Sequence, residues 1–131
     1  DVDHFKQRND TMGHQAGDAA LRVFSECVRT SLRANDTLGR YGGDEFVVIL
    51  PDTTEADALR VADRIRLALH THPMQALFRA RALTASIGIA SSRHHGLLLE
   101  TLIAAADTAV YESKRLGRDR ASVARSTVPR S

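Results

Sequence analysis

Residues 37–50 read Thr-Leu-Gly-Arg-Tyr-Gly-Gly-Asp-Glu-Phe-Val-Val-Ile-Leu, and this stretch decides the fold class. The apolar run 46–50, closed by Pro51, is typical of a buried strand, and a shorter strand-like run precedes the glycines. Together they predict a β-hairpin with Gly42-Gly43-Asp44-Glu45 at its tip. Because the two glycines have no side chains, a bulky ligand could approach the backbone of the tip. The same four residues could also form an ordinary hairpin turn without any ligand.

Stretches with helical periodicity lie on both sides of this hairpin. Residues 15–32 carry small apolar side chains at spacings of three and four, which predicts a helix. A second amphipathic helix is expected after Thr53 or Thr54, and a third over residues 98–116. Residues 78–91 alternate and predict a strand pair, and a short strand is expected near residues 121–124. Helices interleaved with strands favour an α/β or α+β sandwich with helices packed over one sheet.

The bulk composition limits the class of protein. A chain of 131 residues has room for one domain, and 43% hydrophobic with 26% charged residues is ordinary for a globular protein. A formal net charge of +2 is too weak to indicate nucleic acid or an anionic membrane surface as a partner. The single cysteine, Cys27, cannot form an internal disulfide, and no membrane-spanning run or signal peptide is visible. We therefore expect a cytoplasmic protein.

Acidic side chains gather in two places. Asp1 and Asp3 would share one side of an extended chain, and Asp44 follows the two glycines of the hairpin tip. Mg²⁺ needs two or so carboxylate oxygens and leaves its other positions to water and substrate phosphates, so Asp1 and Asp44 are candidate ligands. The basic run 114–118 at the end of the third helix is by itself better explained as a cap that complements the helix dipole than as a phosphate site. The candidate phosphate-binding cations are Lys6, Lys114 and Arg118.

Five blocks of sequence follow one another in a recognisable order: DVDHFKQRND (1–10), GHQAGD (13–18), RYGGDEF (40–46), TASIG (84–88) and ADTAVY (106–111), the last followed by Lys114 and Gly117-Arg118. In order and spacing they resemble the GGDEF family, over nearly the whole chain. The resemblance implies a diguanylate cyclase, which condenses two GTP into cyclic di-GMP and two pyrophosphates. It also implies an α+β fold whose central, mostly antiparallel sheet is flanked by helices, similar to nucleotidyl cyclases and the palm of polymerases.

The resemblance also implies roles for individual residues. Two Mg²⁺ or Mn²⁺ ions per site would be held by Asp1, Asp44 and the backbone carbonyl of Val2. Asn9 and Asp18 are similar to the pair that reads guanine, and a carboxylate suits that base because guanine presents two adjacent donors. Whether Asp44 or Glu45 helps to remove the 3′-proton stays open. The implied catalytic residues are Asp44, Glu45 and Lys6, and the implied substrate-binding residues are Asn9, His14, Asp18, Gly42, Gly43, Lys114 and Arg118.

The same resemblance extends to partners and domain limits. Each family domain binds one GTP and supplies half of the reaction centre, so a homodimer is expected, normally enforced by an N-terminal sensory or regulatory domain. The family places a hydrophobic strand immediately before Asp1, and without it we expect weak activity. The cyclase domain would cover residues 1–124, with residues 125–131 as a flexible tail.

A second site is implied upstream of the hairpin. Arg33 and Asp36 resemble the product-inhibition motif of the family, completed by Arg64, and would bind cyclic di-GMP. Arg suits such a ligand because it can grip phosphate with two nitrogens and stack on guanine. The alternative is an exposed salt bridge that closes a helix.

Departures from the family pattern, and two rival functions, remain. Asp119 stands where the family commonly has Asn, and Met12 replaces a common aromatic residue. The rivals are a receptor that binds guanine nucleotides without turnover and a cyclase that joins ATP to GTP. The intact acidic signature argues against the first, and Asp18 argues against the second.

Overall fold

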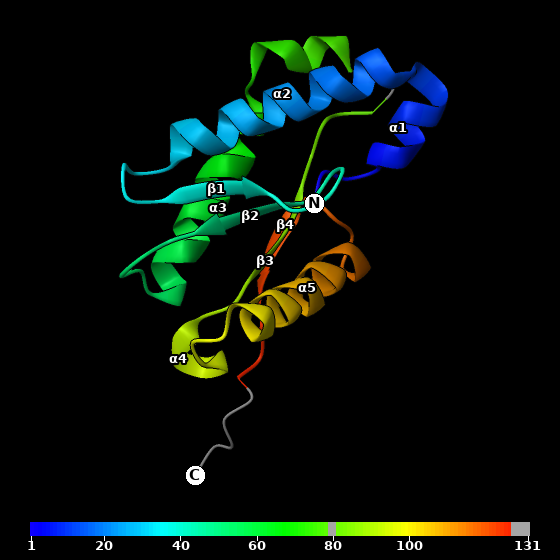
Figure 1. Cartoon of the computed structure of the whole chain (residues 1–131). Coiled ribbons are helices and arrows are strands. Elements are labelled where there is room, and N and C mark those ends of the chain that lie inside the picture. Colours follow the sequence, from blue (N-terminus) through cyan, green and yellow to red (C-terminus); the bar gives the residue numbers. More distant parts are fainter. Residues whose placement is uncertain (79–80, 127–131) are drawn as a thin grey trace.

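The computed structural model describes residues 1–78 and 81–126, so most of the expected tail at residues 125–131 lies outside the described part (Figure 1). Helices and short strands make up an α+β fold, as the sequence predicts. The elements are α1 (Phe5–Met12), α2 (His14–Ser31), β1 (Thr37–Arg40), β2 (Phe46–Ile49), α3 (Glu55–His70), the 3-10 helix η1 (Pro73–Leu77), β3 (Ser86–Ile89), α4 (Ser92–His95), α5 (Leu99–Arg115) and β4 (Arg120–Val123).

The predicted hairpin forms from β1 and β2. The two strands pair antiparallel, with Leu38 opposite Val48 and Arg40 opposite Phe46. The ring of Phe46 lies 5.0 Å from that of Phe24, centroid to centroid, so β2 packs on α2. The hairpin prediction is therefore confirmed, and its tip, residues 41–45, projects beyond this packed base.

The expected single sheet is divided in the described part of the chain into two pairs of strands. β1 and β2 form one, and β3 pairs parallel with β4 in the other. Within the described residues, the N-terminal segment 1–3 links the two pairs, because Val2 forms a bridge with Ala85 and its N–H donates to the carbonyl of Asp44. The predicted strand pair within residues 78–91 is wrong, because the side chain of Gln75 takes the backbone N–H and C=O of Leu83 that a partner strand would need.

The apolar core lies between the strand pairs and the helices. α2 and α3 pack together on one side, and α5 covers the β3–β4 pair on the other (Figure 1). Thr54 caps α3 by accepting from the N–H of Asp57, which confirms one of the two predicted caps. Of the helices in the described residues, none is long and apolar enough to cross a bilayer. The buried apolar residues include Val2, Leu21, Phe24, Val28, Ile65, Leu69 and Leu83.

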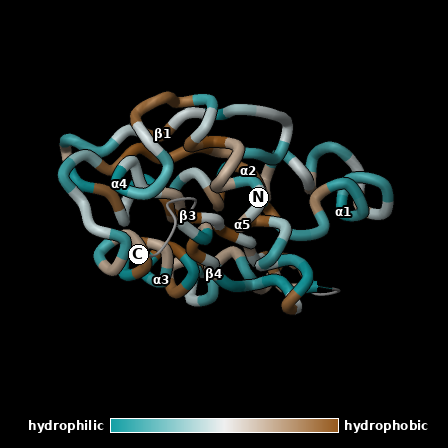
Figure 2. The backbone as a smooth tube through the Cα atoms, turned by 90° about the horizontal axis from the view of Figure 1, so that it is seen from below, coloured by the Kyte–Doolittle hydropathy of each residue, from teal (hydrophilic) through white to brown (hydrophobic). Residues whose placement is uncertain are grey.

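Helix α1 was not expected from the sequence. It has no apolar face of the predicted kind, and Figure 2 shows it as a mostly hydrophilic segment at one end of the molecule. Its first residue follows His4, which lies in the left-handed region (φ 57°), and it ends at Gly13 (φ 88°). These two turns, rather than an apolar pattern, define the helix, and Gly13 supplies the positive φ at little cost.

Helix α5 approaches β3 through a glycine. A Cβ on Gly88 would lie 2.1 Å from the carbonyl oxygen of Ala106 and 2.6 Å from the backbone nitrogen of Val110. Because backbone atoms cannot move aside as a flexible side chain can, no larger residue fits here without moving the helix. Gly88 therefore sets the distance between α5 and β3.

We predict that Gly88→Ala destabilises the protein by about 1–3 kcal/mol, the usual cost of overpacking, measured as the free energy of unfolding in urea. Gly39→Ala is the control, because a Cβ there would meet only the carbonyl oxygen of Val47 at 4.0 Å. Equal stability of the two variants would contradict the close approach of α5.

Candidate functional site

The N-terminal residues lie between the hairpin tip and β3. On one side, the N–H of Asp3 donates to the carbonyl of Thr84 (2.9 Å), and the N–H of Ser86 donates to that of Asp1 (2.9 Å). This antiparallel pairing turns the N–H and C=O of Val2 the opposite way. There the N–H of Val2 donates to the carbonyl of Asp44 (3.3 Å). The structure thus brings the two predicted metal-binding segments together, with the Val2 carbonyl on the side of Asp44.

Helix α5 contributes a cation to the same place. Lys114 Nζ lies 2.7 Å from Asp1 Oδ2. The Asp1 side chain is 13% exposed and that of Lys114 is 37% exposed, so the pair lies at the mouth of the site. Lys114 therefore contacts a residue that is predicted to bind metal, and its role in the site stays a prediction.

The donor set fits a hard divalent cation that keeps open positions. In residues 1–78 and 81–126, no group of three or more His, Cys, Asp or Glu side chains could hold a metal by itself. Asp1 and Asp44 offer two carboxylates, and the Val2 carbonyl lies on the side of the N-terminal segment that faces Asp44. Mg²⁺ and Mn²⁺ accept such oxygen ligands and complete their shells with water and phosphate oxygens, so the residues fit the predicted ions.

Arg40 holds the glycine-rich tip in shape. Its Nε donates to the carbonyl of Gly42 (3.2 Å) and its Nη2 to that of Gly43 (2.6 Å). Neither glycine has a positive φ, and a Cβ added to Gly43 would meet nothing within 4 Å. Since the fold itself does not demand glycine at position 43, the open space beside it suits a ligand that approaches the backbone.

Gly17 lies beside the two residues that are predicted to read guanine, Asn9 and Asp18. A Cβ on Gly17 would lie 1.6 Å from Asn9 Oδ1, so the amide of Asn9 rests directly on the backbone of α2. Asp18 is the next residue on α2 and is exposed. Asn9 Oδ1 is buried and has no hydrogen-bond partner. The pair therefore meets where α1 packs on α2.

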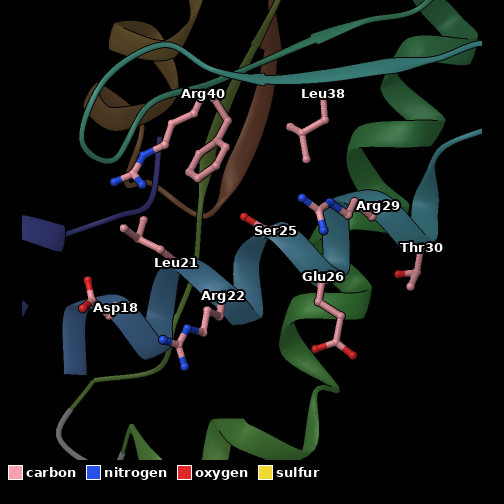
Figure 3. A pocket seen from close by; sticks show the side chains of 10 residues that line it. Asp18, Leu21, Arg22, Ser25, Glu26, Arg29, Thr30, Leu38 and Arg40 are labelled. Carbon is pink, nitrogen blue, oxygen red and sulfur yellow. The ribbon is translucent and has the colours of Figure 1, made fainter. Parts of the chain in front are cut away.

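Asp18 lies at one end of a groove of about 860 Å³ between α2 and the hairpin (Figure 3). Leu21 and Phe46 provide apolar walls, and Arg40 enters from the hairpin side. A flat base with polar edges suits such a lining, because its faces contact apolar side chains while its edges meet a few polar groups.

Three predicted residues make no side-chain contact that fixes them in the site. Lys6 on α1 and His14 at the start of α2 are exposed, and their side chains make no hydrogen bond or ion pair within the described residues. Arg118 follows α5 in a turn, where its N–H donates to the carbonyl of Ser113 (2.9 Å). Arg118 and Asp119 both have positive φ, 64° and 48°. Such residues cost on the order of 1–3 kcal/mol each, so the surrounding contacts must hold the turn.

The predicted inhibitory residues also come together. Arg33 donates from its backbone N–H (2.8 Å) and its guanidinium (3.3 and 3.4 Å) to Asp36. The Arg33 guanidinium also donates to Thr53 Oγ1 (2.8 Å). The pKa of Asp36 lies below its usual value. The hydrogen bond from the Arg33 N–H lowers it most, followed by the Arg33 side chain and then by the charge of Arg64. The three residues form one cluster on the surface away from the hairpin tip.

Sequence reasoning missed two residues of the site region. Arg40 belongs to one of the blocks that resemble the family and has no predicted role, although its position two residues before the glycines is a usable signal. Asp3 is predicted to share one side of the extended chain with Asp1. Its carboxylate is buried, 2% exposed, and accepts hydrogen bonds from Thr84, Ser86 and Asp119, so the fold itself already occupies its oxygens.

Comparison with known sequences identifies one family over most of the chain. The family described as "Diguanylate cyclase, GGDEF domain" matches residues 1–120. The chain is 45% identical over 121 residues to the response regulator PleD of Caulobacter vibrioides, covering 91% of this chain and 27% of that protein. It is 36% identical over 131 residues to diguanylate cyclase A of Treponema denticola, covering 100% and 35%. It therefore spans about a third or less of these relatives.

Solved structures give the same result for the fold. The GGDEF domain of the Pseudomonas aeruginosa protein TpbB, also called YfiN, superposes with a TM-score of 0.84 at 37% identity, covering 95% of this chain and 73% of that one. The GGDEF domain of DgcB from Caulobacter crescentus, solved in complex with c-di-GMP, superposes with a TM-score of 0.80 at 31% identity, covering 94% and 73%.

We predict that the Asp36 carboxyl titrates below its usual pKa in an NMR pH titration. Arg33→Ala should raise this pKa only part of the way, because the backbone N–H of residue 33 remains. The depressed pKa means that this contact stabilises the fold above the ordinary Asp pKa and is lost as the pH falls through the lowered value. An ordinary pKa in the unmutated protein would contradict the cluster.

Proposed function

The chain belongs to the GGDEF family of diguanylate cyclase domains, and from this premise we propose that it condenses two GTP into cyclic di-GMP and two pyrophosphates. The observation that carries the proposal is the hydrogen bond from Val2 to Asp44, because it joins the Asp1 carboxylate and the glycine-rich tip in one site.

The reaction consists of two identical phosphoryl transfers. In each, the 3′-oxygen of one GTP loses its proton and attacks the α-phosphorus of the other. The new P–O bond forms as the bond between the α- and β-phosphates breaks, and pyrophosphate leaves. Positioning and charge supply most of the catalysis in such transfers. Asp1, Asp44 and the Val2 carbonyl would hold two divalent ions per site. The ions would neutralise charge on the α-phosphate and on the leaving pyrophosphate.

The remaining residues orient the nucleotide. We assign Asp18 and Asn9 to the guanine edge, because the Asp18 carboxylate can accept from both N–H groups of that base. Gly42 and Gly43 leave space for the nucleotide along the tip, and His14 lies beside the proposed base site. Either Asp44 or Glu45 would help to take the 3′-proton. The cations assigned to the phosphates are Lys6, Lys114 and Arg118.

Two chains are needed for a complete reaction centre. Because each proposed site holds one GTP, the two 3′-oxygens can each reach the other α-phosphate only when two sites face each other across a twofold axis. The relatives are about three times as long as this chain, so they contain sequence outside the region that it matches. We propose that a regulatory domain on the N-terminal side brings the two chains together.

Cys27 lies in the core, where burial and then the nearby charge of Glu26 raise its pKa, so it packs as a small apolar residue. We propose the cytoplasm as the location, because a single cysteine without a disulfide partner in the chain is most common in reducing compartments.

The proposed activity is tested with a chain that is extended upstream of Asp1 by the strand that the family places there and is then fused to a dimeric coiled coil. This protein is incubated with GTP and Mg²⁺ and assayed by chromatography. The dimer should make cyclic di-GMP, and Asp44→Ala should lower the rate by about 100-fold or more, the scale on which a lost charge-stabilising group acts. Nucleotide binding without product in both proteins would support the receptor instead. A mixed product from ATP and GTP would support the other rival.

We further propose that cyclic di-GMP binds at Arg33, Asp36 and Arg64 and inhibits the enzyme. Removing the Arg33 guanidinium should weaken inhibition about tenfold or more, since it deletes a charge-assisted, two-nitrogen contact. The measurement is the inhibition constant of cyclic di-GMP for the Arg33→Ala variant. The control is Arg60→Ala, which removes an exposed arginine from α3, the helix that also carries Arg64. Unchanged inhibition in Arg33→Ala would refute the site.

A further inference from the structure

Asp3 is a buried carboxylate that has no place in the proposed chemistry. It is 2% exposed, and its two oxygens accept three hydrogen bonds: from Ser86 Oγ (2.6 Å), from Thr84 Oγ1 (2.8 Å) and from the backbone N–H of Asp119 (3.0 Å). None of these donors is a basic side chain. A buried carboxylate is costly unless such bonds satisfy it, so the arrangement must serve a purpose in the fold or the site.

The three hydrogen bonds join three separate segments. Asp3 belongs to the N-terminal segment that carries Asp1 and Val2. Thr84 and Ser86 lie at the start of β3, and Asp119 lies in the turn between α5 and β4. One carboxylate therefore ties the proposed metal ligands to the turn that carries Arg118.

That turn is conformationally strained and is held from two sides. Arg118 and Asp119 are consecutive L-residues with positive φ, a conformation that persists only where the surroundings fix it. Asp3 holds the backbone N–H of Asp119 from one side. From the other side, His70 Nε2 (2.8 Å) and Arg66 Nε (3.3 Å) of α3 contact Asp119 Oδ1.

We propose that Asp3 is a positioning residue for the triphosphate of the substrate. By fixing the N–H of Asp119, it sets the direction in which Arg118 leaves the turn, one helical turn beyond Lys114. This inference rests on the proposed function, since it assigns Arg118 to a phosphate. Asp3 itself contacts neither substrate nor metal.

If Asp3 is replaced, its charge alone and its positioning role predict opposite changes in triphosphate affinity, which makes the inference testable. Removing a negative charge near an anion-binding site should strengthen binding of a triphosphate if charge alone matters. Releasing the turn should weaken it, because Arg118 is no longer held in place. Neither effect should change the affinity for the guanine base, which is assigned to Asn9 and Asp18.

The test is calorimetric binding of 3′-deoxy-GTP and of guanosine to the full chain with Mg²⁺. The 3′-deoxy nucleotide lacks the attacking oxygen and is not consumed. Asp3→Ala should weaken 3′-deoxy-GTP about tenfold, equal to 1.4 kcal/mol, and leave guanosine unchanged. Asp3→Asn should recover much of this loss, because its amide nitrogen can turn to the Ser86 hydroxyl while its oxygen keeps the N–H of Asp119.

Asp57→Asn is the matched control, since it removes the same charge from an exposed carboxylate on α3 and should change neither affinity. A double-mutant cycle adds a second test: in an Arg118→Ala background, Asp3→Ala should cost little more. If Asp3→Ala does not fold, Asp3→Asn carries the test by itself, with a triphosphate affinity about threefold below the unmutated protein.

Three results would overturn the inference: triphosphate binding by Asp3→Ala that is equal to or tighter than that of the unmutated protein (or, if this variant does not fold, tighter binding by Asp3→Asn), an equal loss for guanosine, or additive effects in the cycle. Its failure is distinct from that of the proposed function. An unmutated chain that binds 3′-deoxy-GTP but makes no cyclic di-GMP as a dimer contradicts the cyclase proposal alone, whereas one that binds no nucleotide contradicts both.

Discussion

The site depends on one short stretch of backbone pairing, in which the first three residues lie between the hairpin tip and β3. Val2 bonds to Asp44 on one side, and Asp3 bonds to Thr84 on the other. These bonds connect two strand pairs that are otherwise separate in the described residues. Because the hydrogen bonds are directional, they also fix which groups face the opening: the Asp1 carboxylate, the Val2 carbonyl and the tip.

Close packing at glycines brings the helices to this central segment. Gly88 lets α5 lie directly on β3, so that Lys114 reaches Asp1. Gly17 lets the amide of Asn9 rest on α2 beside Asp18. The groups that would contact metal, phosphate and base thus come from different elements, and their distances are set by backbone contacts that cannot easily adjust.

The sequence predicted the hairpin, three main helices and α+β class because apolar periodicity determines them. It missed α1, whose polar sequence is fixed by the turns at His4 and Gly13 rather than by an apolar face. The resemblance supplied the site residues, and the structure places many of them in three separate groups: Asp1, Val2, Asp44 and Lys114; Asn9 beside Asp18; and Arg33 with Asp36. The roles of Asp3 and Arg40 could not be read from the sequence, because each acts through backbone groups whose positions only the folded chain defines.

The most direct test of this account is NMR spectroscopy with Mn²⁺ and 3′-deoxy-GTP, because the paramagnetic ion broadens the amide signals of residues close to it. If the N-terminal segment and the hairpin tip form one site, the amides of Val2, Asp3 and residues 42–45 should broaden together at the same nucleotide concentration, while those near Arg33 and Asp36 stay sharp. Broadening of one segment without the other would contradict the shared site on which the account rests.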